Sequence, residues 1–113
     1  MSEVKLTKVV ERMDLKNLTP DIDLTEKVIT VPDINRPALQ LTGYFDHFDS
    51  ERVQIIGYVE YTYLQTLTKE RKKEVYRDLL SYGIPCLIFT TEIFPDEELL
   101  KQANETNTPV FST

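Results

Sequence analysis

Glycine and cysteine are scarce in this sequence and tryptophan is absent: three glycines and one cysteine occur among 113 residues. The glycines, Gly43, Gly57 and Gly83, stand far apart, so the chain contains neither a GxGxxG nor a GxxxxGK(S/T) phosphate-binding loop. Phosphoryl transfer depends on backbone amides of such a loop, a lysine and Mg²⁺ to position and neutralise the phosphates. We therefore expect no catalytic centre for phosphoryl transfer in these residues. The lone Cys86 cannot form an internal disulfide.

Long apolar runs and an excess of basic residues are also missing. Charged side chains interrupt residues 1–20, and no window approaches the apolar length of a membrane span, so we expect no signal peptide and no membrane partner. Thirteen basic and nineteen acidic residues give a net charge of -6. Such a chain repels phosphate backbones, which argues against a nucleic-acid partner. The expected compartment is the cytoplasm.

Length and patterning predict a single α/β domain over residues 1–113. A chain of this size buries roughly two-thirds of the surface that its unfolded form exposes, enough for a core. Apolar periodicity, caps and β-branched runs predict alternating helices and strands. Expected helices cover 6–13, a short turn between Arg36-Pro37 and Gly43, 60–67, 68–82 and a segment starting at Pro95; expected strands cover 28–31, 53–58, 86–90 and 108–112. Alternation of this kind implies a largely parallel sheet flanked by helices, in three layers.

Few residues offer chemistry of their own. His47 lies between Asp46 and Asp49 and could act as a general acid/base or metal ligand, but one histidine cannot supply the convergent ligands that zinc needs, so a solvated loop residue is the favoured interpretation. Cys86 lies in an apolar run without a basic neighbour, and we expect it to pack as a small hydrophobe. The sequence predicts no metal site.

Charged and aromatic clusters have two interpretations each. The run Lys69–Glu74 is either a nucleic-acid-binding patch or a solvated helix face, and the second is favoured because acidic and basic residues interleave at helical spacing. The apolar residues that follow are expected to point to the sheet; they are Val75, Leu79, Leu80 and Tyr82. Three tyrosines either complete the core, which is favoured, or form an interface; they are Tyr58, Tyr61 and Tyr63. Arg36, beside Pro37, either contacts a partner or ligand or clamps its own loop.

Residues 31–60 carry a family resemblance. They place unrelated residue types at fixed spacing, and the most specific are Asp33-Ile34, Arg36-Pro37, Leu39, Gly43-Tyr44-Phe45, Arg52, Gln54, Gly57 and Glu60. This pattern resembles the amino-terminal domain of the bacterial HPr kinase/phosphorylases, and the match covers nearly the whole chain. The resemblance implies a fold similar to the UDP-binding domain of the Mur ligases.

The resemblance also implies a function. Members of that family look like hexamers that phosphorylate a regulatory serine of HPr with ATP or pyrophosphate and Mg²⁺, and remove the phosphate again, in carbon catabolite repression. Their catalytic residues belong to a carboxy-terminal P-loop domain, so none can be carried over. The chain is thus expected to be a non-catalytic regulatory or assembly domain without a cofactor, with its own kinase domain and HPr as partners. The alternative is a module binding a nucleotide-sugar or phosphorylated metabolite through Arg36, Tyr44 and Arg52.

Overall fold

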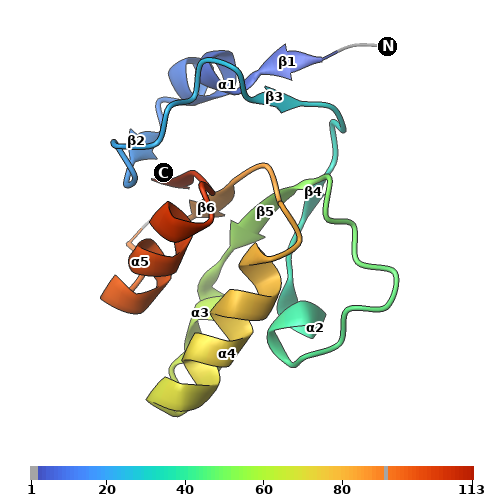
Figure 1. Ribbon diagram of the computed structural model, residues 1–113, viewed down its shortest axis with the longest axis vertical. Coiled ribbons are helices and arrows are strands. Elements are labelled where there is room, and N and C mark those ends of the chain that lie inside the picture. Colours follow the sequence, from blue (N-terminus) through green and yellow to red (C-terminus); the bar gives the residue numbers. More distant parts are fainter. Residues whose placement is uncertain (1–2, 91) are drawn as a thin grey trace.

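The computed structural model describes residues 3–90 and 92–113, and these form a mixed five-stranded sheet with helices on both sides (Figure 1). The strand order is β2-β7-β6-β5-β4. Four strands are parallel, namely β4 (Ile34–Asn35), β5 (Val53–Ile56), β6 (Leu87–Phe89) and β7 (Val110–Ser112). The edge strand β2 (Lys16–Asn17) pairs antiparallel with β7. The predicted α/β class with a largely parallel sheet is confirmed.

Four helices connect the parallel strands. The helix α2 (Ala38–Leu41) joins β4 to β5, α3 (Tyr58–Leu64) and α4 (Lys69–Leu80) join β5 to β6, and α5 (Glu97–Glu105) joins β6 to β7. Figure 1 shows α4 and α5 on one side of the sheet. The larger core lies between these helices and the sheet, and its fully buried members include Leu41, Ile56, Leu79 and Leu87.

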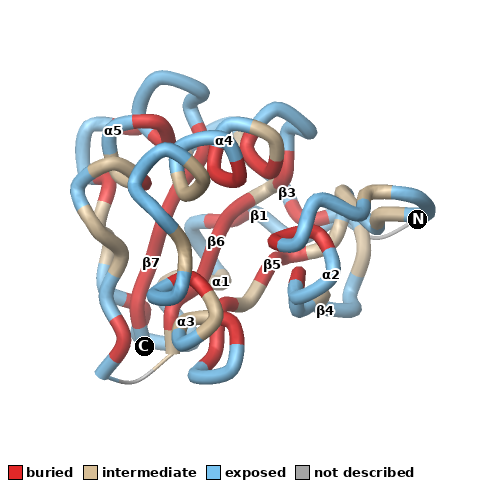
Figure 2. The backbone as a smooth tube through the Cα atoms, turned by 90° about the horizontal axis from the view of Figure 1, so that it is seen from below, coloured by how far each residue is buried: buried red, intermediate tan, exposed pale blue. Residues whose placement is uncertain are grey.

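The amino-terminal segment covers the opposite face. It contains α1 (Leu6–Arg12) and a separate two-stranded antiparallel sheet of β1 (Val4–Lys5) and β3 (Val28–Ile29). A second core lies beneath it, formed by Leu6, Leu15, Ile29, Val53, Cys86, Ile88 and Phe111. Along β6 the two cores alternate, since Leu87 and Phe89 join the first and Ile88 the second, as strand geometry requires. Figure 2 shows the buried strands β6 and β7 enclosed by exposed outer turns.

Several elements differ from the predictions. The strand expected at 28–31 spans only two residues and pairs with β1 instead of joining the main sheet. The helix expected at 60–67 begins at Tyr58, because the Glu60 carboxylate accepts a hydrogen bond from the Gly57 N–H and starts the helix earlier. Asp96, not Pro95, starts α5, since its side chain accepts from Leu99 N–H.

Two apolar side chains are also placed differently from the expectation. The apolar signature residue Leu39 is exposed whereas Leu41 is buried, because the single turn of α2 directs only one of the two leucines to the core. Tyr82 lies beyond the end of α4 and contacts Phe45 and Phe48 of the loop between α2 and β5 instead of the sheet. Within the described ranges, no helix has the length and apolar character needed to cross a bilayer.

Candidate functional site

At the start of α3 the signature residues Gly57 and Glu60 meet Arg36, which comes from a distant part of the sequence. The Arg36 Nη2 atom donates to Glu60 Oε1 at 3.0 Å, and the same oxygen accepts the Gly57 N–H at 2.7 Å. The Glu60 side chain is 4% exposed whereas that of Arg36 is 52% exposed. A buried carboxylate needs such partners, because leaving a charge buried and unpaired costs several kcal/mol. Arg36 therefore holds the end of β4 against the start of α3.

Gly57 provides the space for this ion pair. A Cβ atom at Gly57 would collide with Nη2 of Arg36 and would lie 3.1 Å from Glu60 Oε1. The backbone of Gly57, with φ -100° and ψ -169°, is in an extended conformation that other residues also adopt. Glycine is thus required here for the close approach of Arg36, and no backbone strain is involved.

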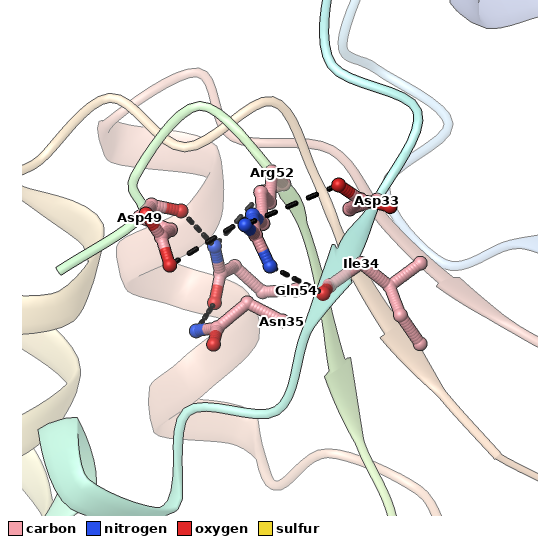
Figure 3. Close-up of polar contacts among 6 residues, drawn as sticks. All are labelled: Asp33, Ile34, Asn35, Asp49, Arg52 and Gln54. Carbon is pink, nitrogen blue, oxygen red and sulfur yellow. Dashed lines mark hydrogen bonds and ion pairs between the residues drawn. The ribbon is translucent and has the colours of Figure 1, made fainter.

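Arg52 joins the start of β4 to the loop that precedes β5 (Figure 3). Its Nη2 lies 4.0 Å from Asp33 Oδ2, its Nε lies 3.8 Å from Asp49 Oδ2, and its Nη1 donates to the Ile34 carbonyl at 3.5 Å. These are long contacts between partly exposed groups, so each contributes little to stability. Their combined effect is to orient the Arg52 guanidinium toward its own chain.

Gln54 fixes the same region from within. Its side chain is fully buried, its Nε2 donates to the carbonyls of Asp49 and Arg52 at 3.1 and 2.8 Å, and its Oε1 accepts from Asn35 at 2.7 Å (Figure 3). Both N–H donors and the oxygen of this amide are therefore hydrogen-bonded inside the protein. Gln54 holds β4 and the 49–52 turn in register with β5.

The signature motif Gly43-Tyr44-Phe45 is divided between the surface and an aromatic cluster. Gly43 has φ 99° and ends α2, where a side chain would be strained. The Phe45 ring stacks on Tyr82 at 4.7 Å, and Phe48 meets both rings edge-on. Tyr44 is 50% exposed. The aromatic cluster Phe45, Phe48 and Tyr82 attaches the loop to the end of α4.

His47 lies at the surface and Cys86 lies in the core, as the sequence predicted. His47 is exposed at the turn of the loop, with φ 60°. The described part of the chain contains no cluster of three or more histidine, cysteine or acidic residues that could bind a metal. Cys86 is fully buried, and burial raises the pKa of its thiol to about 12, so the reactive thiolate is disfavoured.

The three tyrosines separate into two environments. Tyr61 and Tyr63 are partly buried and pack against the larger core, as favoured from the sequence. Tyr58 is 71% exposed and does not follow that expectation, because it occupies the first turn of α3 on the outer side. The Lys69–Glu74 run lies on α4 with Val75, Leu79 and Leu80 buried beneath it, which agrees with a solvated helix face.

A polar contact between α4 and α5 was missed by sequence reasoning. Tyr76 is buried, its hydroxyl donates to Asp96 Oδ2 at 2.9 Å, and Lys72 Nζ lies 3.4 Å from the same oxygen. Burial, with the hydrogen bond to Asp96, raises the pKa of Tyr76 far above its usual range. The adjoining groove of about 820 Å³ has lysines and carboxylates in equal number along its walls, namely Lys69, Glu70, Lys72, Lys73, Asp96, Glu97, Glu98 and Lys101.

The candidate ligand-contacting residues Arg36, Tyr44 and Arg52 thus do not converge on one cavity. Within the described residues, no hydrogen bond or ion pair links the cluster around Arg36 to the cluster around Arg52. Each arginine faces carboxylates of its own chain, and only Arg36 leaves half of its side chain in solvent beside Gly57. The arrangement stabilises a shape, with one exposed guanidinium at its rim.

Comparison with known proteins gives consistent matches. The family model described as "HPr Serine kinase N terminus" matches residues 4–113. An HPr kinase/phosphorylase of Lachnoclostridium phytofermentans is 48% identical over 113 residues, which are 100% of this chain and 37% of that relative. One of Alkaliphilus metalliredigens is 41% identical over 105 residues, 93% of this chain and 34% of the relative. The chain therefore spans about a third of the length of the curated relatives it matches.

Proposed function

Since this chain belongs to the family of HPr serine kinase amino-terminal domains, we propose that it is a regulatory or assembly domain of an HPr kinase/phosphorylase, with no catalytic centre of its own. In this proposal the parent enzyme phosphorylates and dephosphorylates a regulatory serine of HPr in the cytoplasm during carbon catabolite repression. ATP or pyrophosphate and Mg²⁺ are used by a carboxy-terminal domain that these 113 residues do not include. HPr and that domain, within a hexamer, are the proposed partners.

The observation that carries the proposal is the use that the signature residues make of their polar groups. Arg36 pairs with Glu60, Arg52 faces Asp33 and Asp49, and Gln54 bonds inside the protein. Residues built for catalysis would converge on a cavity with perturbed pKa values. Residues that fix the relative positions of β4, the 44–52 loop and α3 instead supply a rigid surface.

Two sequence facts support the same interpretation. The chain lacks a phosphate-binding loop, which phosphoryl transfer requires for positioning and charge neutralisation. The relatives named HPr kinase/phosphorylase contain roughly two-thirds of their length outside the matched region, since the match covers 37% of one and 34% of another. That length is sufficient for a separate catalytic domain of ordinary size.

A phosphoryl-transfer assay tests the proposal. The purified chain is incubated with HPr, ATP and Mg²⁺, then with pyrophosphate and Mg²⁺, and the mass of HPr is measured; the full-length enzyme of Lachnoclostridium phytofermentans is the positive control. We expect an unchanged HPr mass with the chain and a shifted mass with the control. Phosphorylated HPr from the chain alone, in a preparation free of other kinases, would refute a domain without catalysis.

Half-exposed Arg36 favours one second candidate, a small-ligand binding module for a nucleotide-sugar or phosphorylated metabolite. Arg36 directly follows β4, and open parallel sheets bind ligands beyond the carboxyl ends of their strands. A ligand that binds only the native state raises the melting temperature. The candidate predicts a thermal shift with such metabolites in the wild type and a reduced shift in Arg36→Ala. No shift at millimolar concentration, with unchanged NMR signals near Arg36, removes it.

A further inference from the structure

Large apolar side chains are exposed at the carboxyl ends of the two central strands. Tyr58 and Val59 open α3 directly after β5 and are 71% and 65% exposed. Phe94 lies in the connection after β6 and is 58% exposed. Exposed apolar residues that occur singly need no explanation, but several at one edge mark an interaction surface.

The segments that carry these exposed residues begin at neighbouring positions of the sheet. The strands β5 and β6 pair in parallel, and the Thr90 N–H donates to the Ile56 carbonyl at 3.1 Å just where both strands end. The two connections that carry Tyr58, Val59 and Phe94 therefore leave the sheet side by side. We call the surface of Arg36, Tyr58, Val59 and Phe94 the carboxyl-edge patch.

Arg36 supplies the polar rim of this patch. Its Nη2 lies against Gly57, the residue before Tyr58, and is held by the buried Glu60. The guanidinium carries five N–H donors in a planar fork, and the other donors lie on a side chain that is 52% exposed. Tyrosine and arginine around an apolar centre are the residue types enriched where protein surfaces associate.

The direction of the chain indicates which part of the longer protein covers the carboxyl-edge patch. The strand β7 is parallel to β6, and the Thr113 N–H donates to the Phe89 carbonyl at 3.0 Å, so position 113 lies at the same edge as the patch. Figure 2 shows α3 and the carboxyl end of the chain at one end of the sheet. In the relative from Lachnoclostridium phytofermentans, the matched region is 37% of the protein and corresponds to a family of amino-terminal domains, so the remaining polypeptide follows from this edge.

We propose that the carboxyl-edge patch docks the domain that follows this one in the longer HPr kinase/phosphorylases. The docking face of that domain is apolar opposite Tyr58, Val59 and Phe94, with a carboxylate or carbonyl acceptor opposite Arg36. This inference rests on the proposed function, because it takes the chain to be one domain of the longer enzyme. Docking through this patch couples the position of the following domain to the Arg36–Glu60 pair.

Cysteine labelling tests the proposal on a favourable background, since the only native cysteine, Cys86, is fully buried. Single variants Tyr58→Cys and Phe94→Cys are compared with the control Met13→Cys, whose side chain is 60% exposed just after α1, on the helix layer that covers the other face. Each is made in the 113-residue chain and in a hybrid in which this chain replaces the matched region of the Lachnoclostridium phytofermentans enzyme. Labelling rates are read from peptide masses.

We expect all three positions to react at similar rates in the chain, and positions 58 and 94 to react at least about tenfold more slowly in the hybrid while position 13 is unchanged. Equal rates at all positions in the hybrid overturn the proposal, and so does equal protection of position 13. Protection that already occurs in the 113-residue chain and grows with concentration identifies a second copy as the occupant and also overturns it.

Two further measurements keep the outcome interpretable. Carbene footprinting of the unsubstituted chain and hybrid compares native Tyr58 and Phe94 with Met13, so the result does not depend on a variant that fails to fold. HPr phosphorylation is measured on the hybrid and on the chain separately. An active hybrid with an unprotected patch refutes docking alone, whereas an active 113-residue chain refutes the proposed function alone.

Discussion

The contact between Arg36 and Glu60 predicts how a substitution at Gly57 changes the stability of the protein. In Gly57→Ala the new methyl group takes the position of Arg36 Nη2, and Arg36 must withdraw from Glu60. Because the extended backbone of Gly57 suits alanine, the substitution costs no backbone strain. The destabilisation should therefore depend on whether Arg36 is present.

The magnitude follows from the burial of the two partners. A hydrogen bond to a charged group contributes about 1.5–3 kcal/mol, and the half-exposed guanidinium reduces this to about 1–2 kcal/mol. Replacing glycine by alanine also restricts the unfolded chain, which stabilises the protein by about 0.4–1 kcal/mol. We expect Gly57→Ala to lower the free energy of unfolding by about 0–1.6 kcal/mol in the wild type and to raise it by about 0.4–1 kcal/mol in an Arg36→Ala background, which is a coupling energy of about 1–2 kcal/mol. The contact of the new Cβ atom with Glu60 Oε1 is present in both backgrounds, so it cancels in the coupling energy.

Urea unfolding of the four proteins in this double-mutant cycle, followed by circular dichroism, measures the difference. Gly83→Ala is the matched control: Gly83 has φ 68° and open space around it, so alanine there is strained but should cost the same with and without Arg36. A coupling energy between positions 57 and 36 below about 0.5 kcal/mol, within the additivity found for independent sites, would show that Gly57 does not make room for the ion pair.

Two other groups give predictions that stability measurements can check. The pKa of the Cys86 thiol is raised from 9.0 to about 12, so the folded protein retains a proton that the unfolded chain loses above pH 9. Stability should be unaffected by this group below pH 9 and fall by up to about 1.4 kcal/mol per pH unit above it, and Cys86→Ala should show a shallower fall between pH 9 and 10. Asp96→Ala removes the cap of α5 and leaves the buried Tyr76 hydroxyl without its acceptor, at a cost of about 2 kcal/mol. Adding Tyr76→Phe should recover about 1 kcal/mol in urea unfolding, and no recovery would mean that the hydroxyl finds another partner.

Elements with strong local signals were predicted well. Thr68 caps α4 with its hydroxyl, and the helix expected over 68–82 is observed at Lys69–Leu80. The strands β6 and β7 lie within the expected ranges 86–90 and 108–112, because parallel strands buried on both faces read as apolar runs. By contrast, β1, β2 and β4 have two residues each, which is too short for any periodicity to appear.

The sequence singled out Arg36, but it could not identify the residue that Arg36 contacts in the fold. Arg36 had two open interpretations, and its contact with Glu60 supports the clamp, although 24 positions separate them and no spacing rule connects them. Phe45 and Tyr82 meet for a similar reason, through tertiary packing of a loop on a helix end. Whether Arg36, Tyr44 and Arg52 contact a ligand or partner stays a prediction.

The pairing of β2 with β7 joins the two ends of the chain, since Lys16 lies opposite Ser112 and Asn17 opposite Phe111. Phe111 also belongs to the core beneath the amino-terminal layer. On a ribosome β2 must therefore wait for β7 to be synthesised, roughly 5–20 s at the usual rate of synthesis. Until then Leu6 and Leu15 lack the strand that completes their packing. Within this domain the segment from α1 to β2 therefore completes its packing last, and it stays exposed to chaperones and proteases until β7 has been made.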